Sequence, residues 1–201
     1  QINIGANNKD SKSIAIILEP PSERGIGMLT YTYNASDKDN ETWLYLSALG
    51  KVKRIASGSD DEATEPTSMF GSEITTEDQE TGKLDDYTYK ILQRGTYKGR
   101  PVAVIESVPT PQRLQHTRYG KVRTWVDTER FISLKMQMFD KHGNAIKQVS
   151  VAKVEKINGI WLARSMTFKN LVSQRLTNMK IKAISFGLNI NDGFLTQRAL
   201  T

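Results

Sequence analysis

The sequence predicts a single, predominantly antiparallel β domain that spans residues 1–201. Apolar residues alternate with polar ones at a period of two over most of the chain, and helical periodicity is marginal. Short turns rich in Gly, Pro, Asn and Asp separate these alternating segments. With 201 residues, of which 38% are hydrophobic and 25% charged, the chain can bury one sizeable core. We expect about 10–11 strands, and a sheet of that size must curl, split or close.

The first part of the chain contains two expected strand pairs. The apolar run before Pro20 and Pro21 ends at that pair of prolines, because proline cannot donate to a ladder. A turn at 23–27 returns the chain, and 34–40 is a second, polar turn. The expected strands of this part are 13–19, 28–33, 42–46 and 51–55.

Residues 56–86 interrupt the strand pattern. The stretch begins with an acidic, glycine- and serine-rich run at 57–62, continues with apolar Met69 and Phe70, and then holds helix-capping residues and acids. A loop of this length in a compact β protein is a binding loop, a lid or a disordered segment. We expect a lid insertion over 56–86, with one or two short helices.

Longer strands resume after the insertion. Pro109 and Pro111 break the chain between two of them. Asn158-Gly159 is the strongest hairpin signal, and Gly143 stands in a second hairpin turn where a positive φ is expected. The tail, 192–200, resembles one capped helical turn. The expected strands of this part are 87–94, 101–108, 122–126, 134–139, 145–157, 160–171 and 174–186.

Composition and charge exclude several classes of protein. There is no cysteine, which excludes disulfide frameworks and zinc–thiolate sites. The longest apolar run, 14–18, is far shorter than the roughly 20 residues that a membrane-spanning helix needs. The net charge of +6 favours acidic partners, either anionic lipid headgroups or nucleic acid. The chain opens at Gln1 without an apolar signal segment, so we expect that a signal peptide has been removed.

The sequence carries no pattern that is typical of an enzyme. His116 and His142 lie in expected turns without a nucleophile or a second ligand nearby, so we interpret both as exposed turn residues. Nucleophile elbows, phosphate-binding loops and zinc-protease motifs are absent from the sequence. The acidic pairs at 60–61 and 85–86 are typical of solvated loops. We therefore expect no catalytic residues, no cofactor and no metal.

Basic stretches and scattered methionines point to binding instead. In Lys51-Val52-Lys53-Arg54 charged and apolar residues alternate, as in a strand with one solvent-exposed face. The aromatic residues form no base-stacking platform beside it. Six methionines are distributed over the expected strands and lid. Methionine adapts to irregular partners as well as filling cores, so a curved sheet that fails to close could present these side chains to a ligand.

Several stretches resemble, in collinear order, the outer-membrane lipoprotein-sorting proteins of the LolA-like superfamily. The resemblance covers nearly the whole chain from about residue 14. It is carried by Trp43-Leu44-Tyr45-Leu46 with Lys51-Val52-Lys53-Arg54-Ile55, by Phe70-Gly71-Ser72-Glu73-Ile74-Thr75-Thr76-Glu77-Asp78, and by the later blocks Asp86-Tyr87-Thr88-Tyr89, Trp125-Val126-Asp127, Phe139-Asp140-Lys141-His142-Gly143, Ile157-Asn158-Gly159-Ile160-Trp161 and Phe194-Leu195-Thr196-Gln197-Arg198-Ala199-Leu200.

The resemblance implies an unclosed, strongly curved antiparallel β-barrel, LolA/LolB-like, with a loop or short-helix lid over an apolar cavity. It implies a carrier in the periplasm of a Gram-negative bacterium, which binds a lipid or the acyl chains of a lipoprotein for transfer toward the outer membrane. We expect transient contact with an anionic membrane surface and a possible inner-membrane transporter as partner, and no nucleic acid. The residues expected to line the cavity are Trp43, Tyr45, Met69, Phe70, Ile74, Met136, Met138, Trp161 and Met166.

Two other functions remain open at this stage. The chain could be a non-enzymatic periplasmic adaptor that docks on an inner-membrane transporter without lipid cargo. Nucleic-acid binding would instead give an affinity that falls steeply with salt.

Overall fold

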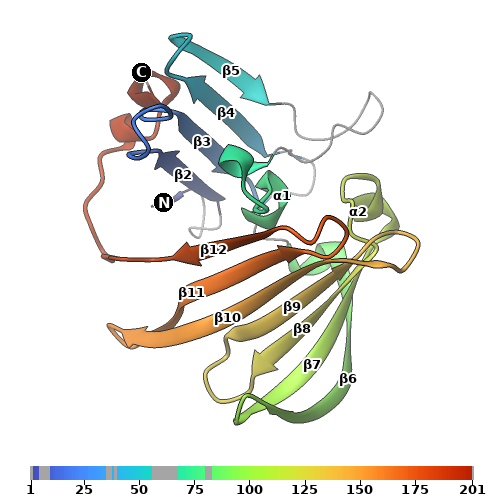
Figure 1. The fold of residues 1–201 in the computed structure, drawn as a ribbon. Coiled ribbons are helices and arrows are strands. Elements are labelled where there is room, and N and C mark those ends of the chain that lie inside the picture. The colour runs from blue at the N-terminus through green and yellow to red at the C-terminus, as the bar shows by residue number, and fades with distance from the viewer. Residues whose placement is uncertain are drawn as a thin grey trace. The chain divides into compact units, whose positions relative to one another are not determined.

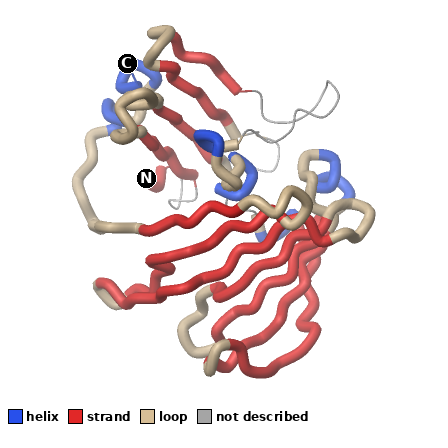
Figure 2. Tube along the Cα trace, viewed as in Figure 1, coloured by secondary structure: helices blue, strands red, loops and turns tan. Residues whose placement is uncertain are grey.

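A computed structural model describes residues 2–4, 10–34, 38, 40–55, 68–79 and 83–200. The described strands form two separate antiparallel sheets, one of five strands and one of seven, and neither sheet closes on itself (Figures 1 and 2). The chain divides into two compact units: Gln1–Gly58 with Ser185–Thr201, and Ser59–Ile184. The mainly β, unclosed antiparallel architecture is confirmed, while the single domain over 1–201 stays a prediction.

The first unit contains the five-stranded sheet, in which sequential strands pair as neighbours. Its elements are β1 (Ile2–Ile4), β2 (Asp10–Ile16), β3 (Gly27–Thr32), β4 (Glu41–Leu46), β5 (Lys51–Ile55) and the short 3-10 helices η4 (Asp192–Phe194) and η5 (Gln197–Leu200). The buried side chains of Leu29 and Trp43 pack against Leu195 and Leu200 from the far end of the chain. The Tyr31 hydroxyl also donates to the carbonyl oxygen of Leu195, at 2.7 Å.

The second unit contains the seven-stranded sheet, in the order β12-β11-β10-β9-β8-β7-β6. All neighbouring strands of this sheet pair antiparallel. Figure 1 shows them as a strongly twisted meander. Its elements are η2 (Met69–Gly71), α1 (Thr76–Gln79), η3 (Leu84–Asp86), β6 (Tyr87–Tyr97), β7 (Arg100–Pro109), α2 (Pro111–Gln115), β8 (Lys121–Asp127), β9 (Ser133–Phe139), β10 (Ala145–Ile157), β11 (Ile160–Asn170) and β12 (Leu176–Lys180).

The turn chemistry explains the hairpins of this sheet. Asn158 and Gly159 both have positive φ, 48° and 82°, as the two-residue β10–β11 turn requires. Gly143 has φ 89° between β9 and β10, so the positive φ expected there is confirmed. Asp140 holds the same turn, because its Oδ1 accepts hydrogen bonds from the amides of His142 and Asn144.

Four details differ from the sequence prediction. Strand β1 was not expected, so the described residues contain twelve strands where about 10–11 were predicted. The last strand ends at Lys180 rather than at residue 186, because its pairing with β11 stops at Ser165. The proline-rich break after β7 contains the short helix α2, in which the Thr110 side chain caps the Arg113 amide and Pro111 occupies the first turn. The tail forms two 3-10 turns instead of one. The acidic run at 57–62 of the expected lid lies outside the described residues.

Candidate functional site

The seven-stranded sheet has one face that is mainly apolar. Residues paired directly across neighbouring strands share a face, so the register sorts the side chains. We call this the apolar face, and two of its rows define it: Tyr89, Ser107, Val122, Met138, Lys147 and Asn170, and next to it Ile91, Ile105, Thr124, Met136, Val149, Phe168 and Thr177. Lys147 is the single charged residue in these two rows.

The centre of the apolar face is a packed cluster. Met138, Val149, Phe168 and Tyr119 are buried there. The partly buried side chains that pack against them are Ile74, Val122, Met136, Ile146, Met166 and Met179. The structure thus brings four of the nine expected residues into one cluster: Met136, Met138 and Met166 on this face, and Ile74, which packs against it from outside the sheet.

Residues 68–79, which we call the cover segment, lie on the β10–β12 end of this face. The amide of Glu73 donates to Thr177 Oγ1 at 2.9 Å, and Asn170 Nδ2 donates to Glu73 Oε2 at 3.0 Å. The Glu73 carboxylate also forms an ion pair with Arg175, at 3.1 Å. Polar contacts from β11, β12 and the loop between them therefore hold the cover segment on the sheet.

A buried ion pair fixes the helical end of the cover segment. Lys147 Nζ lies 2.5 Å from Asp78 Oδ2, and both side chains are only 2% exposed. The other oxygen, Oδ1, accepts a hydrogen bond from the Tyr119 hydroxyl at 2.8 Å. Oδ2 also accepts one from the Thr75 amide at 2.8 Å, which places Asp78 as the capping acid in the first turn of α1. Burial, and then the Asp78 charge, raise the pKa of the Tyr119 hydroxyl far above its ordinary value.

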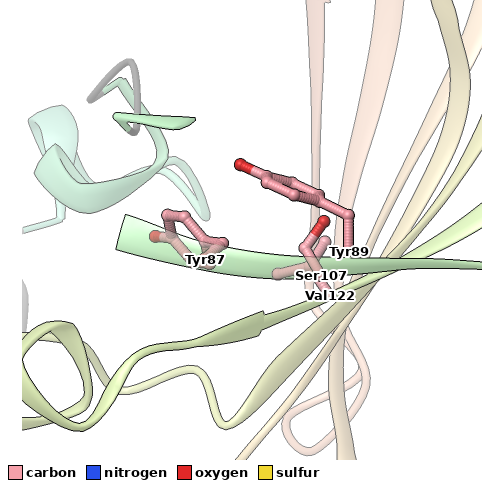
Figure 3. Close-up of a pocket in the computed structure, with 4 residues that line it drawn as sticks. All are labelled: Tyr87, Tyr89, Ser107 and Val122. Atoms are coloured by element: carbon pink, nitrogen blue, oxygen red, sulfur yellow. The ribbon is translucent and has the colours of Figure 1, made fainter. Parts of the chain in front are cut away.

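The β6–β8 end of the apolar face is open. A hollow of about 250 Å³ lies there, lined by Tyr87, Tyr89, Ser107 and Val122. Figure 3 shows the two tyrosines projecting from β6, with Ser107 and Val122 beside the base of Tyr89. The centroids of the two tyrosine rings are 6.4 Å apart. The pKa of the Tyr89 hydroxyl is raised, mainly because the side chain is partly buried and secondly because Tyr87 is close to it. Tyr89 and Ile91 are each 50% exposed, so apolar surface faces solvent at this end.

The remaining expected cavity residues lie elsewhere, and none of the nine is among the four that line the hollow. Trp43 and Tyr45 belong to the small core of the first unit. Met69 and Phe70 form η2 of the cover segment, where Phe70 has φ 54°. Trp161 lies on β11 with Arg130 4.4 Å above its ring, outside the central cluster.

Sequence reasoning missed the hollow and the ion pair. The alternation Tyr87-Thr88-Tyr89 signals two tyrosines on one strand face, and this is the signal that could have indicated the hollow. The Lys147–Asp78 contact joins residues 69 positions apart in the sequence, and no local sequence pattern predicts it.

The described residues contain no group of three histidine, cysteine or acidic side chains placed like metal ligands. Within the same part of the chain, no helix combines the length and the hydropathy that crossing a bilayer would require. The chemistry that the apolar face offers is apolar contact, with the two tyrosine hydroxyls and Ser107 as polar groups at its open end.

These features define a class of protein, the mainly β proteins built from unclosed antiparallel sheets. The fold is similar to that of a DUF1329 family protein from Desulfovibrio piger, with a TM-score of 0.91 and 23% identity over 99% of this chain and 80% of that one. It is also similar to a putative outer membrane lipoprotein-sorting protein domain from Vibrio parahaemolyticus, with a TM-score of 0.86 and 23% identity over 98% and 80% of the two chains. A LolA superfamily protein from Nitrosomonas europaea gives a TM-score of 0.61 and 18% identity over 94% and 77%.

The chain belongs to a family described as that of an uncharacterized protein, whose model matches residues 9–201. No curated protein matches it. The expected resemblance to the LolA-like superfamily is confirmed at the level of the fold.

Proposed function

We propose that the protein is a periplasmic carrier of a Gram-negative bacterium, which binds a lipid or the acyl chains of a lipoprotein for transfer toward the outer membrane. The observation that carries the proposal is the apolar face, closed at one end by the cover segment and open at the other beside Tyr89 and Ile91. The fold that the chain shares with the lipoprotein-sorting protein domain from Vibrio and the LolA superfamily protein from Nitrosomonas supports the same proposal. The proposal includes no catalytic step, cofactor or metal.

The energetics of such a carrier depend on shielding rather than on tight binding. Burying one methylene group contributes about 0.8 kcal/mol, so a 16-carbon chain would gain up to roughly 12 kcal/mol in a dry site. A bilayer offers a similar gain. The carrier therefore only has to keep the chain from water during transit and then release it.

The size of the hollow suggests how loading would occur. Its volume of about 250 Å³ is below the roughly 300–1,000 Å³ of ordinary small-molecule sites. It can hold one part of an acyl chain, next to the exposed side chains of Tyr89 and Ile91. In our proposal the cover segment, with Met69 and Phe70, acts as a lid that moves off the β10–β12 end and exposes the methionine cluster. The methionines suit this role because they repack around irregular chains.

The test is uptake of a fluorescent acyl-chain probe by the delipidated protein, with mass spectrometry of solvent extracts from gently purified protein beside it. A charge at buried Met138 would unfold the sheet as well as block the site, so the informative position is Ile91. We expect Ile91→Asp to abolish probe uptake, because it introduces a charge at the open end of the apolar face. The matched control is Val108→Asp. Val108 is 39% exposed, and its register with Thr88 puts it on the opposite face of the same sheet.

Equal uptake by the two folded variants would refute the assignment of the site. Failure of the native protein to take up the probe, together with extracts free of acyl species, would refute carriage. The adaptor function, with docking on an inner-membrane transporter and no lipid cargo, would then remain.

A further inference from the structure

The positive charge of the chain is concentrated in the seven-stranded sheet. Residues 83–184 contain 20 lysines and arginines against 7 acidic residues, a net charge of +13. The whole chain has a net charge of only +6, and 59–82 contain 8 acids and no basic residue. The sheet that carries the apolar face is therefore also the basic part of the molecule.

The register places six of these 20 cations on the face opposite the apolar one. The row Lys90, Glu106, Arg123, Gln137, Gln148, Lys169 and Leu176 alternates with the two apolar rows. Lys121, Lys135 and Lys180 pair with residues of the same face. We call this the basic face, defined by Lys90, Lys121, Arg123, Lys135, Lys169 and Lys180. The one acid in the row from Lys90 to Leu176 is Glu106, which forms an ion pair with Arg123 at 2.9 Å.

Aromatic rings hold three of these cations close to the sheet. Lys121 and Arg123 lie over the ring of Phe139, with their charged groups 4.9 and 5.1 Å from its centre. Lys135 lies 4.5 Å above the ring of Trp125. Such contacts keep the charges in fixed positions on rigid strands. They also cover the two rings, which are then not free to stack nucleic-acid bases.

We propose that the basic face is a docking surface for an anionic lipid bilayer. A broad sheet face with six cations and one neutralised acid complements a layer of negative headgroups. Each lysine or arginine near such a layer strengthens binding about fivefold. Docking in this way leaves the apolar face and the cover segment directed away from the bilayer, so docking and loading are separate steps. Cargo would pass around the β6 edge, where the hollow opens.

This inference rests on the proposed function in one respect, because a lipid carrier has to bind a membrane in order to load or release its cargo. The test is co-sedimentation of the full chain with phosphatidylcholine vesicles, with and without phosphatidylglycerol. We expect binding only to the anionic vesicles, and its loss as salt rises from about 0.1 M to about 1 M, where the Debye length falls to roughly 3 Å. The variant Lys121→Gln/Lys135→Gln/Lys169→Gln should weaken binding about 100-fold.

The matched control, Lys51→Gln/Lys53→Gln/Lys141→Gln, removes the same charge from exposed positions outside the basic face. We expect it to change vesicle binding less than tenfold. Equal losses in both folded triple variants would show an effect of net charge alone and would overturn the proposal. Absence of binding to anionic vesicles, or salt-sensitive binding of a DNA oligonucleotide in its place, would overturn it as well.

Probe uptake separates this proposal from carriage. The basic-face variant should take up the acyl probe in solution as the native protein does. Vesicle binding without probe uptake would refute carriage and leave the docking surface intact, whereas probe uptake without vesicle binding would do the reverse.

Discussion

Lys147 and Asp78 form an ion pair that is removed from water at the boundary between the sheet and the cover segment. Lys147 comes from the apolar face of β10, and Asp78 comes from α1. Two charges at 2% exposure are tolerated because each is the partner of the other and because Tyr119 and Thr75 also donate to the carboxylate. The pair thus joins α1 of the cover segment to β10 across 69 residues, in addition to the polar contacts that Glu73 makes with β11 and β12.

Removing the lysine from this pair should strongly destabilise the second unit. In Lys147→Met the Asp78 carboxylate stays buried without its cation, and we expect the free energy of unfolding to fall by about 3–5 kcal/mol. Urea denaturation followed by circular dichroism measures the loss. The control is Lys153→Met, whose side chain is 68% exposed and should change stability by less than about 0.5 kcal/mol. Similar values for the two variants would contradict the role of the ion pair.

The Asp127 carboxylate should make stability depend on acid pH. Its hydrogen bond with Arg100, together with the amides of Glu129 and Arg130, lowers its pKa from 3.8 to about 2. A lowered pKa in the folded state means that the unfolded chain takes up the proton first, so this stabilisation is complete above about pH 4 and is lost as pH falls through about 2. It amounts to about 2 kcal/mol.

Urea denaturation between about pH 5 and pH 2 measures this dependence. Asp127→Asn should be less stable than the native protein at neutral pH. Its free energy of unfolding should also fall less steeply as the pH is lowered. The exposed Asp85→Asn should keep the decline of the native protein. If the free energy of unfolding of Asp127→Asn ran parallel to that of the native protein over the whole pH range, Asp127 would be excluded as the source of the acid dependence.

Gly120 is required by close packing rather than by its backbone angles. A Cβ at this position would lie 2.5 Å from the carbonyl oxygen of Asp140 and 2.9 Å from the Cα of Lys141. Both are backbone atoms that cannot rotate away, so Gly120→Ala should cost about 1–3 kcal/mol. Gly95→Ala is the control, because a Cβ there meets nothing within 4 Å. We expect that variant to be neutral or slightly stabilising in thermal denaturation. Equal melting temperatures would show that the chain relaxes around residue 120.

Trp43 should contribute more stability to the first unit than any exposed aromatic residue there. It is buried, and its ring packs edge-on against Tyr31 with centroids 4.9 Å apart. We expect Trp43→Ala to lower the free energy of unfolding by about 3–5 kcal/mol. Phe194→Ala in η4, where the side chain is 66% exposed, should change it by less than about 0.5 kcal/mol. Circular dichroism is the suitable probe, since the substitution removes a fluorophore.

The sequence predicted the strands of this protein far better than their assembly. Period-two alternation and turn residues located β2–β12 to within a few residues at most ends, and Asn158-Gly159 has the backbone that its hairpin needs. Alternation within one strand does not specify which strands become neighbours. The division into two sheets and the packing of Leu195 and Leu200 under β3 and β4 therefore had to come from the structure.

The candidate site was predictable in part for the same reason. Met136 and Met138 alternate on one strand and share a sheet face with Met166, and Ile74 of the cover segment packs against the same cluster. Trp43 and Trp161 were grouped with them by residue type, which carries no information about position. The Tyr87–Tyr89 hollow and the Lys147–Asp78 pair depend on register between distant strands, which a single sequence does not encode locally.

The first unit is built from two segments that are far apart in the sequence, since Leu29 and Trp43 pack with Leu195 and Leu200. A ribosome therefore delivers Leu29 and Trp43 well before Leu195 and Leu200. The strands of the seven-stranded sheet are contiguous in the chain and can pair as they are synthesised, whereas β3 and β4 must wait for residues that lie beyond that sheet. We therefore expect the five-stranded sheet to complete its core after the seven-stranded sheet, although its strands precede that sheet in the chain.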